Sequence, residues 1–215
     1  MNKDQKLNLL IGLYVGALFA SNLLGGKLMP IGFGGRGLTV SIIMFPLLFL
    51  ITDVVGEVYG RKKANEFVKI GLISLCFLLF WQIFAISVPG AVPNEWYEVF
   101  NESYNNVFGL TISFTIASIM AFLFGQYTDV LIFHIMKKFQ KGKMMWLRNN
   151  VSTFFGQFID SSVWAFIAFF PLLLNGTFTF FSLYGIVIIP YWLAKVIVAM
   201  IDTPLAYLGV KWLRK

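Results

Sequence analysis

Four aspartates lie inside hydrophobic stretches that are long enough to cross a membrane: Asp53, Asp129, Asp160 and Asp202. A charged side chain at the centre of a membrane-inserted helix costs roughly 2.5–3.5 kcal/mol. Such residues normally face a bundle interior or a water-filled cavity, where they mark pathways for ions or substrates. The sequence therefore predicts a membrane protein built around a buried acidic site.

Two of these aspartates end near-copies of one short phrase. Residues 124–129 read FGQYTD, and residues 155–160 repeat the phrase as FGQFID. In both copies a glutamine precedes the aspartate by three residues, so the two side chains share one helix face. An ionised carboxylate only accepts hydrogen bonds, whereas an amide also donates them. Two such pairs could hold the edge of a flat polar heterocycle. We expect five side chains to line this pocket: Asp53, Gln126, Asp129, Gln157 and Asp160.

Asn22 and Lys195 are further candidate ligand-binding residues. Lys195 lies near mid-depth in the last hydrophobic stretch and could balance an acid on a neighbouring helix. Asn22 adds a neutral donor and acceptor to the first stretch. The alternative interpretation is that such polar groups only tie membrane helices together. For Glu57, which precedes Arg61 by four residues, we expect an i,i+4 ion pair near the membrane surface.

The helical rise of about 1.5 Å per residue sets the depth of each acid. Asp53 and Asp129 lie eight residues before a basic residue and Asp202 lies nine, which puts each roughly 12–14 Å inside the cytoplasmic boundary. Asp160 lies twelve residues after Arg148, which puts it roughly 18 Å inside, near the midplane. Two antiparallel helices would thus bring the repeated phrases to similar depths.

The elements that must position these residues are transmembrane helices. The 215-residue chain is 58% hydrophobic and 13% charged, with a mean hydropathy of +0.77, which is more apolar surface than a soluble domain could hide. Six segments are long enough to span a hydrocarbon layer about 30 Å thick. Their approximate bounds are 7–24, 38–59, 67–88, 107–136, 151–174 and 182–210. We predict an all-α fold, in which residues 1–215 form one six-helix transmembrane domain embedded in the lipid bilayer.

The basic residues are sorted by side of the membrane. Most of the 17 Lys and Arg residues lie at the two termini and after the second and fourth predicted helices. The positive-inside rule then places both termini in the cytoplasm, as in a multi-pass protein of the cytoplasmic membrane. The net charge of +7 is thus a topology signal, and we expect no nucleic-acid partner.

We predict a protein without cofactor, metal or catalytic activity. The sequence lacks a GxxxxGK[ST] phosphate loop, so the chain does not hydrolyse ATP by that route. The single histidine, His134, makes a metal site unfavourable, and the single cysteine, Cys76, is expected to be a small buried residue. Two rivals to a self-sufficient transporter are a substrate-binding subunit that needs a separate ATPase module and a purely structural subunit. A third, an intramembrane aspartyl protease, lacks its GxGD phrase.

Two surface features allow two interpretations each. Gly12, Gly16 and Ala20 form a small-residue face on the first helix, which suits packing within the bundle or docking of another protein. Residues 89–106 carry acids and aromatics at helical spacing. This pattern suits a short amphipathic helix on the outer surface, which either lies at the interface or covers an outward-facing cavity.

In several of these residues and their neighbours, the chain resembles a known family, the queuosine-precursor transporters, which is also called the vitamin uptake transporter family. The resemblance covers nearly the whole chain and depends on the order and spacing of its motifs. They are Ser21-Asn22, Phe45-Pro46, Thr52-Asp53, EVYG at 57–60, GQYTDV at 125–130, RNNVST at 148–153, QFIDS at 157–161, and Lys195.

The resemblance implies six helices and import of a deazapurine precursor of the modified tRNA base queuosine. Such precursors are 7-cyano-7-deazaguanine and 7-aminomethyl-7-deazaguanine. The family is distantly similar to the substrate-binding membrane subunits of energy-coupling-factor importers. A carboxylate could accept the ring N–H and amino donors of a deazaguanine edge, by the logic of base readout. Stacking on an aromatic ring, worth about 1–3 kcal/mol per base, would add affinity, although composition does not select the ring. Assembly of identical copies is compatible with the sequence.

Overall fold

The computed structural model describes residues 1–30, 38–90, 94–141, 143–177 and 179–214. The apolar runs within them are helical, because a helix satisfies its own backbone N–H and C=O groups where no water is present. The first helix begins at a capping box, in which Asn2 and Gln5 exchange hydrogen bonds between side chain and backbone. The longest helix likewise begins after a capping residue, since Asn94 accepts from the backbone N–H of Tyr97.

Helices make up nearly all of the regular structure, and a single short pair of antiparallel strands accompanies them in the described part of the chain. In chain order the elements are α1 (Lys3–Leu24), β1 (Leu28–Met29), β2 (Leu38–Thr39), the 3-10 helix η2 (Val40–Ile43), α2 (Met44–Tyr59), α3 (Arg61–Ser87), α4 (Glu95–Phe139), α5 (Met145–Ala168), α6 (Phe170–Leu174), α7 (Phe180–Leu183), the π-helix η3 (Tyr184–Ile188) and α8 (Ile189–Arg214).

Five helical stretches of the described chain are long and apolar enough to cross a membrane. They are Lys3–Leu24, Val40–Tyr59, Arg61–Ser87, Glu95–Phe139 and Phe180–Arg214. Five of the six predicted spans therefore have a counterpart. The remaining one, α5, is 24 residues long but more polar, and its polar side chains are turned inward: Arg148, Asn149, Gln157 and Asp160 are all buried. Whether α5 is a sixth span stays a prediction.

The amphipathic helix expected near residues 89–106 is not a separate element, and residues 91–93 lie outside the described part. From Glu95 onward the segment belongs to α4, which continues unbroken for 45 residues to Phe139. No proline or glycine interrupts the stretch between Glu95 and Phe108, so the helix has no reason to stop at the membrane surface. At about 1.5 Å per residue α4 is about 68 Å long, roughly twice the hydrocarbon thickness.

The predicted span 38–59 begins as strand β2 and the 3-10 helix η2 before α2 starts at Met44. The last two predicted spans also differ in their bounds. The predicted span 151–174 is in fact α5 followed by the separate short helix α6, and α5 starts earlier because its first polar residues are buried and therefore remain helical. The predicted span 182–210 lies within a longer helical stretch that includes the π-helix η3, and Pro204 lies inside α8 without ending it.

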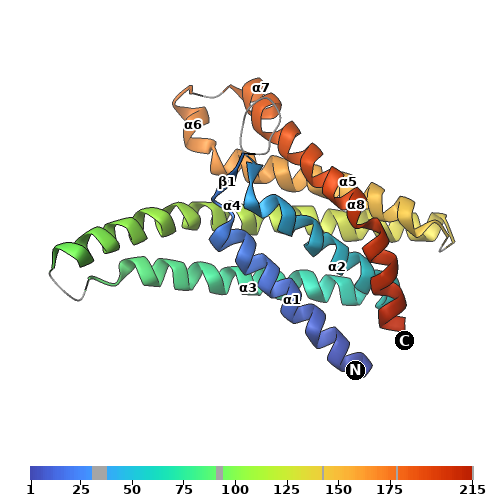
Figure 1. Ribbon diagram of the computed structural model, residues 1–215. Coiled ribbons are helices and arrows are strands. Elements are labelled where there is room, and N and C mark those ends of the chain that lie inside the picture. Colours follow the sequence, from blue (N-terminus) through green and yellow to red (C-terminus); the bar gives the residue numbers. More distant parts are fainter. Residues whose placement is uncertain (31–37, 91–93, 142, 178, 215) are drawn as a thin grey trace.

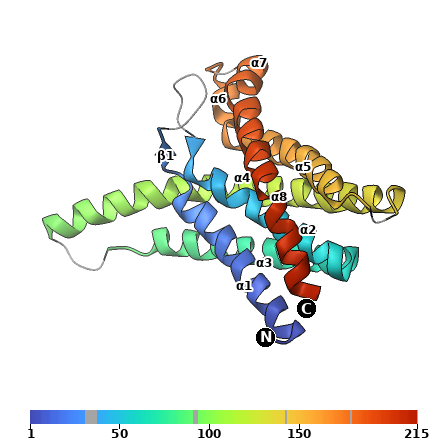
Figure 2. The same ribbon diagram turned by 45° about the vertical axis from the view of Figure 1, so that its right-hand side comes forward.

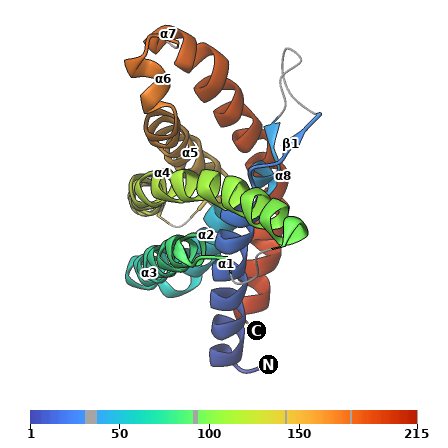
Figure 3. The same ribbon diagram turned by 90° about the vertical axis from the view of Figure 1, so that its left-hand side faces the viewer.

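The long helices α3, α4 and α5 lie side by side, and α1, α2 and α8 cross them (Figure 1). Viewed along that layer, α4 lies between α3 and α5 (Figure 3). The two chain ends lie close together (Figure 2), where Nζ of Lys6 donates to the carbonyl oxygen of Trp212 at 2.8 Å. A buried core joins α1, α3 and α4 through Tyr14, Phe67 and Phe122, with ring centroids 5.7 and 6.2 Å from that of Tyr14.

Three surface residues correct or decide earlier expectations. Cys76 is exposed rather than buried, because it lies on the side of α3 opposite Leu75 and Leu78, which face the core. Gly12 and Gly16 do not serve packing within the bundle, since a Cβ added at either would meet nothing within 4 Å. That face of α1 is therefore open in the described structure.

Candidate functional site

A buried ion pair joins α5 to α8. Nζ of Lys195 donates to Oδ2 of Asp160 at 2.6 Å, and the two side chains are 7% and 4% exposed. Nζ of Lys195 also lies 4.5 Å from the ring centroid of Phe45 on α2, in cation–π contact. A buried charge is tolerated when it is paired. The structure confirms that Lys195 balances an acid of a neighbouring helix.

This ion pair lies in the wall of a pocket near the β1–β2 end of the molecule, away from the two chain ends. The pocket encloses about 500 Å³ together with its mouth, of which about 40 Å³ can hold the centre of a water molecule. Its lining comes from α1, the β2–η2 segment, α2, α4, α5 and α8: Ser21, Asn22, Gly25, Gly26, Thr39, Ser41, Phe45, Phe114, Ser118, Asp160, Trp164, Tyr191 and Lys195. The mixture of aromatic walls and few polar groups is typical of small-molecule sites.

Three aromatic rings form one side of the pocket. The rings of Trp164 and Tyr191 are 22° from parallel with centroids 6.4 Å apart, and Phe114 lies 5.6 Å from Trp164. The hydroxyl of Tyr191 accepts from the backbone N–H of Thr39 at 3.2 Å, which holds the ring against the β2–η2 segment. Trp164 thus offers a flat apolar face one helical turn beyond Asp160.

Asn22 offers an unpaired acceptor to this pocket. Its Nδ2 donates to the carbonyl oxygen of Leu18 at 2.9 Å, whereas its buried Oδ1 has no hydrogen-bond partner among the described residues. Leaving a buried acceptor unpaired costs roughly 1–3 kcal/mol, so a ligand N–H at this position would be stabilising. The pocket therefore presents a carboxylate, an ammonium group and a free amide oxygen beside aromatic faces.

The repeated phrases meet where α4 and α5 cross. A Cβ added at Gly125 would lie 2.8 Å from Cβ of Asp160, and one added at Gly156 would lie 2.8 Å from Cβ of Asp129. The two glycines therefore let the helix backbones approach closely, as small residues do in membrane bundles. Each phrase supplies the space that the aspartate of the other phrase occupies.

A second polar layer lies in the interior outside the pocket lining. The carboxyl groups of Asp53 on α2 and Asp129 on α4 are neighbours, and Ser152 and Thr153 on α5 lie beside Asp129. Asp53 is 1% exposed and Asp129 0%. None of their four carboxyl oxygens makes a hydrogen bond of acceptable geometry in the described part of the chain. This layer is more closed than the pocket and richer in unpaired acceptors.

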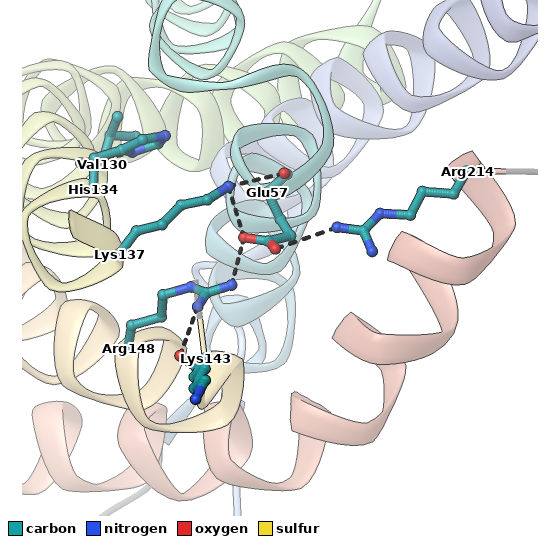
Figure 4. Close-up of polar contacts among 7 residues, drawn as sticks. All are labelled: Glu57, Val130, His134, Lys137, Lys143, Arg148 and Arg214. Carbon is teal, nitrogen blue, oxygen red and sulfur yellow. Dashed lines mark hydrogen bonds and ion pairs between the residues drawn. The ribbon is translucent and has the colours of Figure 1, made fainter. Parts of the chain in front are cut away.

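A third polar cluster, which we call the Glu57 cluster, contains Glu57, Lys137, Arg148 and Arg214 (Figure 4). The carboxylate of Glu57 pairs with Lys137 at 2.9 Å, with Arg148 at 2.5 Å and with Arg214 at 3.4 Å. The expected pair with Arg61 is absent from these contacts. Gly60, with a φ of +85°, ends α2 and turns the chain before Arg61, so the i,i+4 geometry is lost.

Comparison with known proteins assigns the family. Residues 39–209 match the family model described as a vitamin uptake transporter. The chain belongs to the vitamin uptake transporter family. Membership, together with the apolar helices, makes it a multi-pass protein of the cytoplasmic membrane. A transporter family implies a small-molecule substrate, and it favours transport over catalysis.

Two curated relatives of the chain are named queuosine-precursor transporters. "Probable queuosine precursor transporter" from Bacillus subtilis (strain 168) is 26% identical over 178 residues, which cover 81% of this chain and 73% of that protein. "Queuosine precursor transporter" from Escherichia coli (strain K12) is 28% identical over 141 residues, which cover 66% of this chain and 59% of that protein. The second alignment thus spans less than two thirds of the relative. No solved structure shows a significant match.

The structure of this family member brings some of the predicted site residues together and separates others. Asn22, Asp160 and Lys195 line the pocket. The other four predicted residues are buried but lie outside the pocket lining: Asp53, Gln126, Asp129 and Gln157. Gln126 accepts from the hydroxyl of Thr52 at 3.2 Å, next to Asp53. Asp202, the fourth intramembrane aspartate, is only half-buried and belongs to neither group.

Sequence reasoning missed two kinds of residue. Trp164 could not be distinguished from the other aromatics, because only the fold shows which ring lies beside Asp160. For Arg148 the sequence indicates a cytoplasmic boundary and membership of the RNNVST motif but no partner, although its side chain is fully buried and pairs with Glu57. The available signal was its position directly before the polar pair Asn149-Asn150 at the start of a predicted span.

Proposed function

We propose that this chain imports a queuosine precursor, a 7-deazaguanine such as 7-cyano-7-deazaguanine or 7-aminomethyl-7-deazaguanine, across the cytoplasmic membrane. The observation that carries the proposal is the pocket, where the face of Trp164 adjoins the Asp160–Lys195 pair. The names of two relatives supply the substrate class. The choice between these two precursors is part of the proposal.

Recognition would use the two kinds of contact that the pocket provides. The Asp160 carboxylate accepts the ring N–H and amino donors of the guanine-like edge, and Lys195 donates to its carbonyl oxygen, as amide and charged groups do in base readout. Oδ1 of Asn22 accepts a further N–H. Trp164 stacks on the flat ring, which contributes about 1–3 kcal/mol.

The pocket has to widen to admit this ligand. Space for the centre of a water molecule amounts to about 40 Å³, which suits a few waters rather than a bicyclic base. The Asp160–Lys195 pair closes part of that space, and the ligand would replace their mutual hydrogen bond with its own. Binding would then separate α5 from α8 as the first movement of a transport cycle.

We further propose that α5 is the sixth span and that both termini are cytoplasmic. The polar residues of α5 face α4 and the bundle interior, so its low average hydropathy does not describe its outer surface. Lys6, Lys137, Arg148 and Arg214 all belong to contacts at the end where the chain termini meet. Basic residues gathered at one end support a cytoplasmic assignment for it.

The four predicted residues outside the pocket would line the deeper part of the same pathway. Asp53, Gln126, Asp129 and Gln157 are polar and buried, and Asp53 lies between the pocket level and Glu57 in the sequence of α2. They would bind the substrate after it leaves the pocket. Either proton-coupled uptake or facilitated diffusion followed by metabolic trapping is compatible with such a pathway. Uptake that persists after collapse of the proton gradient would eliminate the coupled version.

A second candidate function is a substrate-binding subunit of an importer that needs a separate ATPase module. The observation that favours it is the open small-residue face at Gly12 and Gly16 on α1, which suits close docking of another helix. Uptake by the chain alone, in cells or vesicles without any such module, eliminates this alternative.

The deciding experiment is import in a bacterial strain that cannot make queuosine and lacks its own precursor transporter. With external 7-cyano-7-deazaguanine, expression of the chain should restore queuosine in tRNA. Asp160→Asn should abolish this recovery while the protein remains in the membrane at normal abundance. No recovery from either precursor, with the wild-type protein present and folded, would refute the proposed function.

A further inference from the structure

The Glu57 cluster ties together the helix ends that lie away from the pocket. Glu57 comes from α2, Lys137 from α4, Arg148 from the first turn of α5 and Arg214 from the last turn of α8, and their side chains converge on one carboxylate (Figure 4). Lys137 additionally donates to the carbonyl oxygen of Glu57 at 2.9 Å. Four of the helices that form the pathway are therefore joined at a single acidic residue.

We propose that the Glu57–Arg148 ion pair is the inner gate of the transport pathway, braced by Lys137 and Arg214, and that it must open for substrate to leave into the cytoplasm. This inference rests on the proposed transport function. The pocket lies near the β1–β2 end, whereas the Glu57 cluster lies where the chain ends meet. The structure thus has the features of a state that is closed on the inner side, with its pocket nearer the outer side.

The central pair is buried far more than an ordinary surface ion pair. The Arg148 side chain is 0% exposed and that of Glu57 is 9%. On the same end of the molecule Lys63 and Glu66 form a pair at 2.6 Å, but their side chains are 34% and 54% exposed. Exposed ion pairs contribute little to stability, whereas removing one partner of a buried ion pair strongly destabilises a protein. The Glu57–Arg148 pair can therefore hold two helices together, and the Lys63–Glu66 pair supplies a matched control.

Arg148 also has a second acidic neighbour. Its guanidinium donates to the Lys143 carbonyl oxygen at 3.0 Å and to Glu57, while its buried Nε has no partner among the described residues. Asp53 lies one helical turn before Glu57 on α2, and neither of its carboxyl oxygens has a hydrogen-bond donor in the described structure. Once the Glu57 pair opens, Asp53 is the next carboxylate along α2 to which Arg148 could donate. Such an exchange gives the gate two arrangements that keep the buried charge paired.

The test measures access to the pathway from the inner side. In a Cys76→Ser background a reporter cysteine replaces Ser152, which is fully buried on α5 one turn beyond Arg148. Inside-out vesicles are treated with a membrane-impermeant maleimide. Labelling should be slow when the gate is intact and at least about tenfold faster in Glu57→Gln, since loss of the pair shifts the equilibrium toward the inward-open state. Glu66→Gln should label at the rate of the parent.

Equal labelling of Glu57→Gln and Glu66→Gln, with both proteins folded, would overturn the gate. If Glu57→Gln does not fold, the double variant Glu57→Gln/Arg148→Gln removes both charges of the buried pair and should label fast. It leaves only Lys137 and Arg214 without their acidic partner, and their side chains are 28% and 61% exposed. Failure of both variants to fold would show that the pair is a structural anchor and not a gate. Queuosine recovery in cells is measured in parallel with the parent protein. If the variant labels fast but the parent restores no queuosine, the gate stands and the proposed substrate is wrong. If the parent restores queuosine but the variants label at equal rates, the proposed function stands and the gate is wrong.

Discussion

Gly125 on α4 packs directly against Asp160 on α5, where an added methyl group would lie 2.8 Å from Cβ of the aspartate. Gly156 stands in the same relation to Asp129, and each glycine carbonyl oxygen is 3.1 Å from the Cβ position of the other glycine. The crossing is therefore reciprocal. It gives a physical reason for the repetition of the phrase, because each copy needs a glycine for the other copy's aspartate.

Alanine at Gly156 should destabilise the protein, although alanine is the better helix former. The added methyl group would meet Cβ of Asp129 and force α4 and α5 apart, and such overpacking costs about 1–3 kcal/mol. Thermal unfolding of the purified protein in detergent should show the loss. Gly109→Ala on α4 is the control, because nothing lies within 4 Å of its Cβ; it should be neutral or slightly stabilising. Equal melting temperatures for the two variants would contradict the crossing described here.

Asp160→Asn should weaken binding of 7-cyano-7-deazaguanine about 10- to 100-fold, because hydrogen bonds to a charged group are worth about 1.5–3 kcal/mol. Titration calorimetry of the purified protein measures the effect. Asp202→Asn, which removes a half-buried aspartate outside the pocket, should bind as the parent does. In a double-mutant cycle with Lys195→Gln the two effects should not add, since the side chains are in contact. Strict additivity would argue against a shared ligand.

Trp164→Leu should weaken ligand binding by about 1–3 kcal/mol, the range for stacking of one base on one aromatic ring. The same substitution at Trp81 on α3, which is exposed and outside the pocket, should have no effect on affinity. Quenching of tryptophan fluorescence by the ligand checks both points at once. Quenching that survives in the Trp164 variant would show that the ligand binds elsewhere.

Asp53→Asn should reduce uptake but leave the protein as stable as before or stabilise it by about 1 kcal/mol. The buried Asp53 carboxylate lacks a hydrogen-bond partner in the described structure and lies beside Asp129, so its removal relieves desolvation and like-charge repulsion. Melting temperature and precursor uptake are measured on the same preparation. A large drop in melting temperature would mean that Asp53 is a structural residue and not part of the pathway.

Helix existence could be predicted because it depends on local apolar content. The membrane requires long apolar runs, and five long apolar stretches of the described chain are helical. Helix ends could not be predicted in the same way. The start of α5 at Met145 and the extension of α4 back to Glu95 involve polar residues, whose helical state depends on burial against other helices or on the absence of a breaker.

The candidate site shows the same difference between what local sequence predicts and what depends on packing between helices. Sequence indicated that Asp160 needs a polar partner, and Lys195 is that partner because α5 and α8 are adjacent in space. Glu57 shows the limit of local reasoning. The nearest basic residue in sequence, Arg61, is turned away by Gly60, and the partners come instead from α4, α5 and α8.

The sequence by itself determined that this chain is a membrane protein with carboxylates in its interior, since hydropathy and the energetic cost of buried charge are properties of residue type. The tertiary structure alone decided how those carboxylates are distributed. Asp160 faces the pocket, Asp53 and Asp129 face each other, and Glu57 joins four helix ends. Which charges become neighbours depends on helix crossings such as that at Gly125 and Gly156, and a crossing is a relation between distant segments that no single segment encodes.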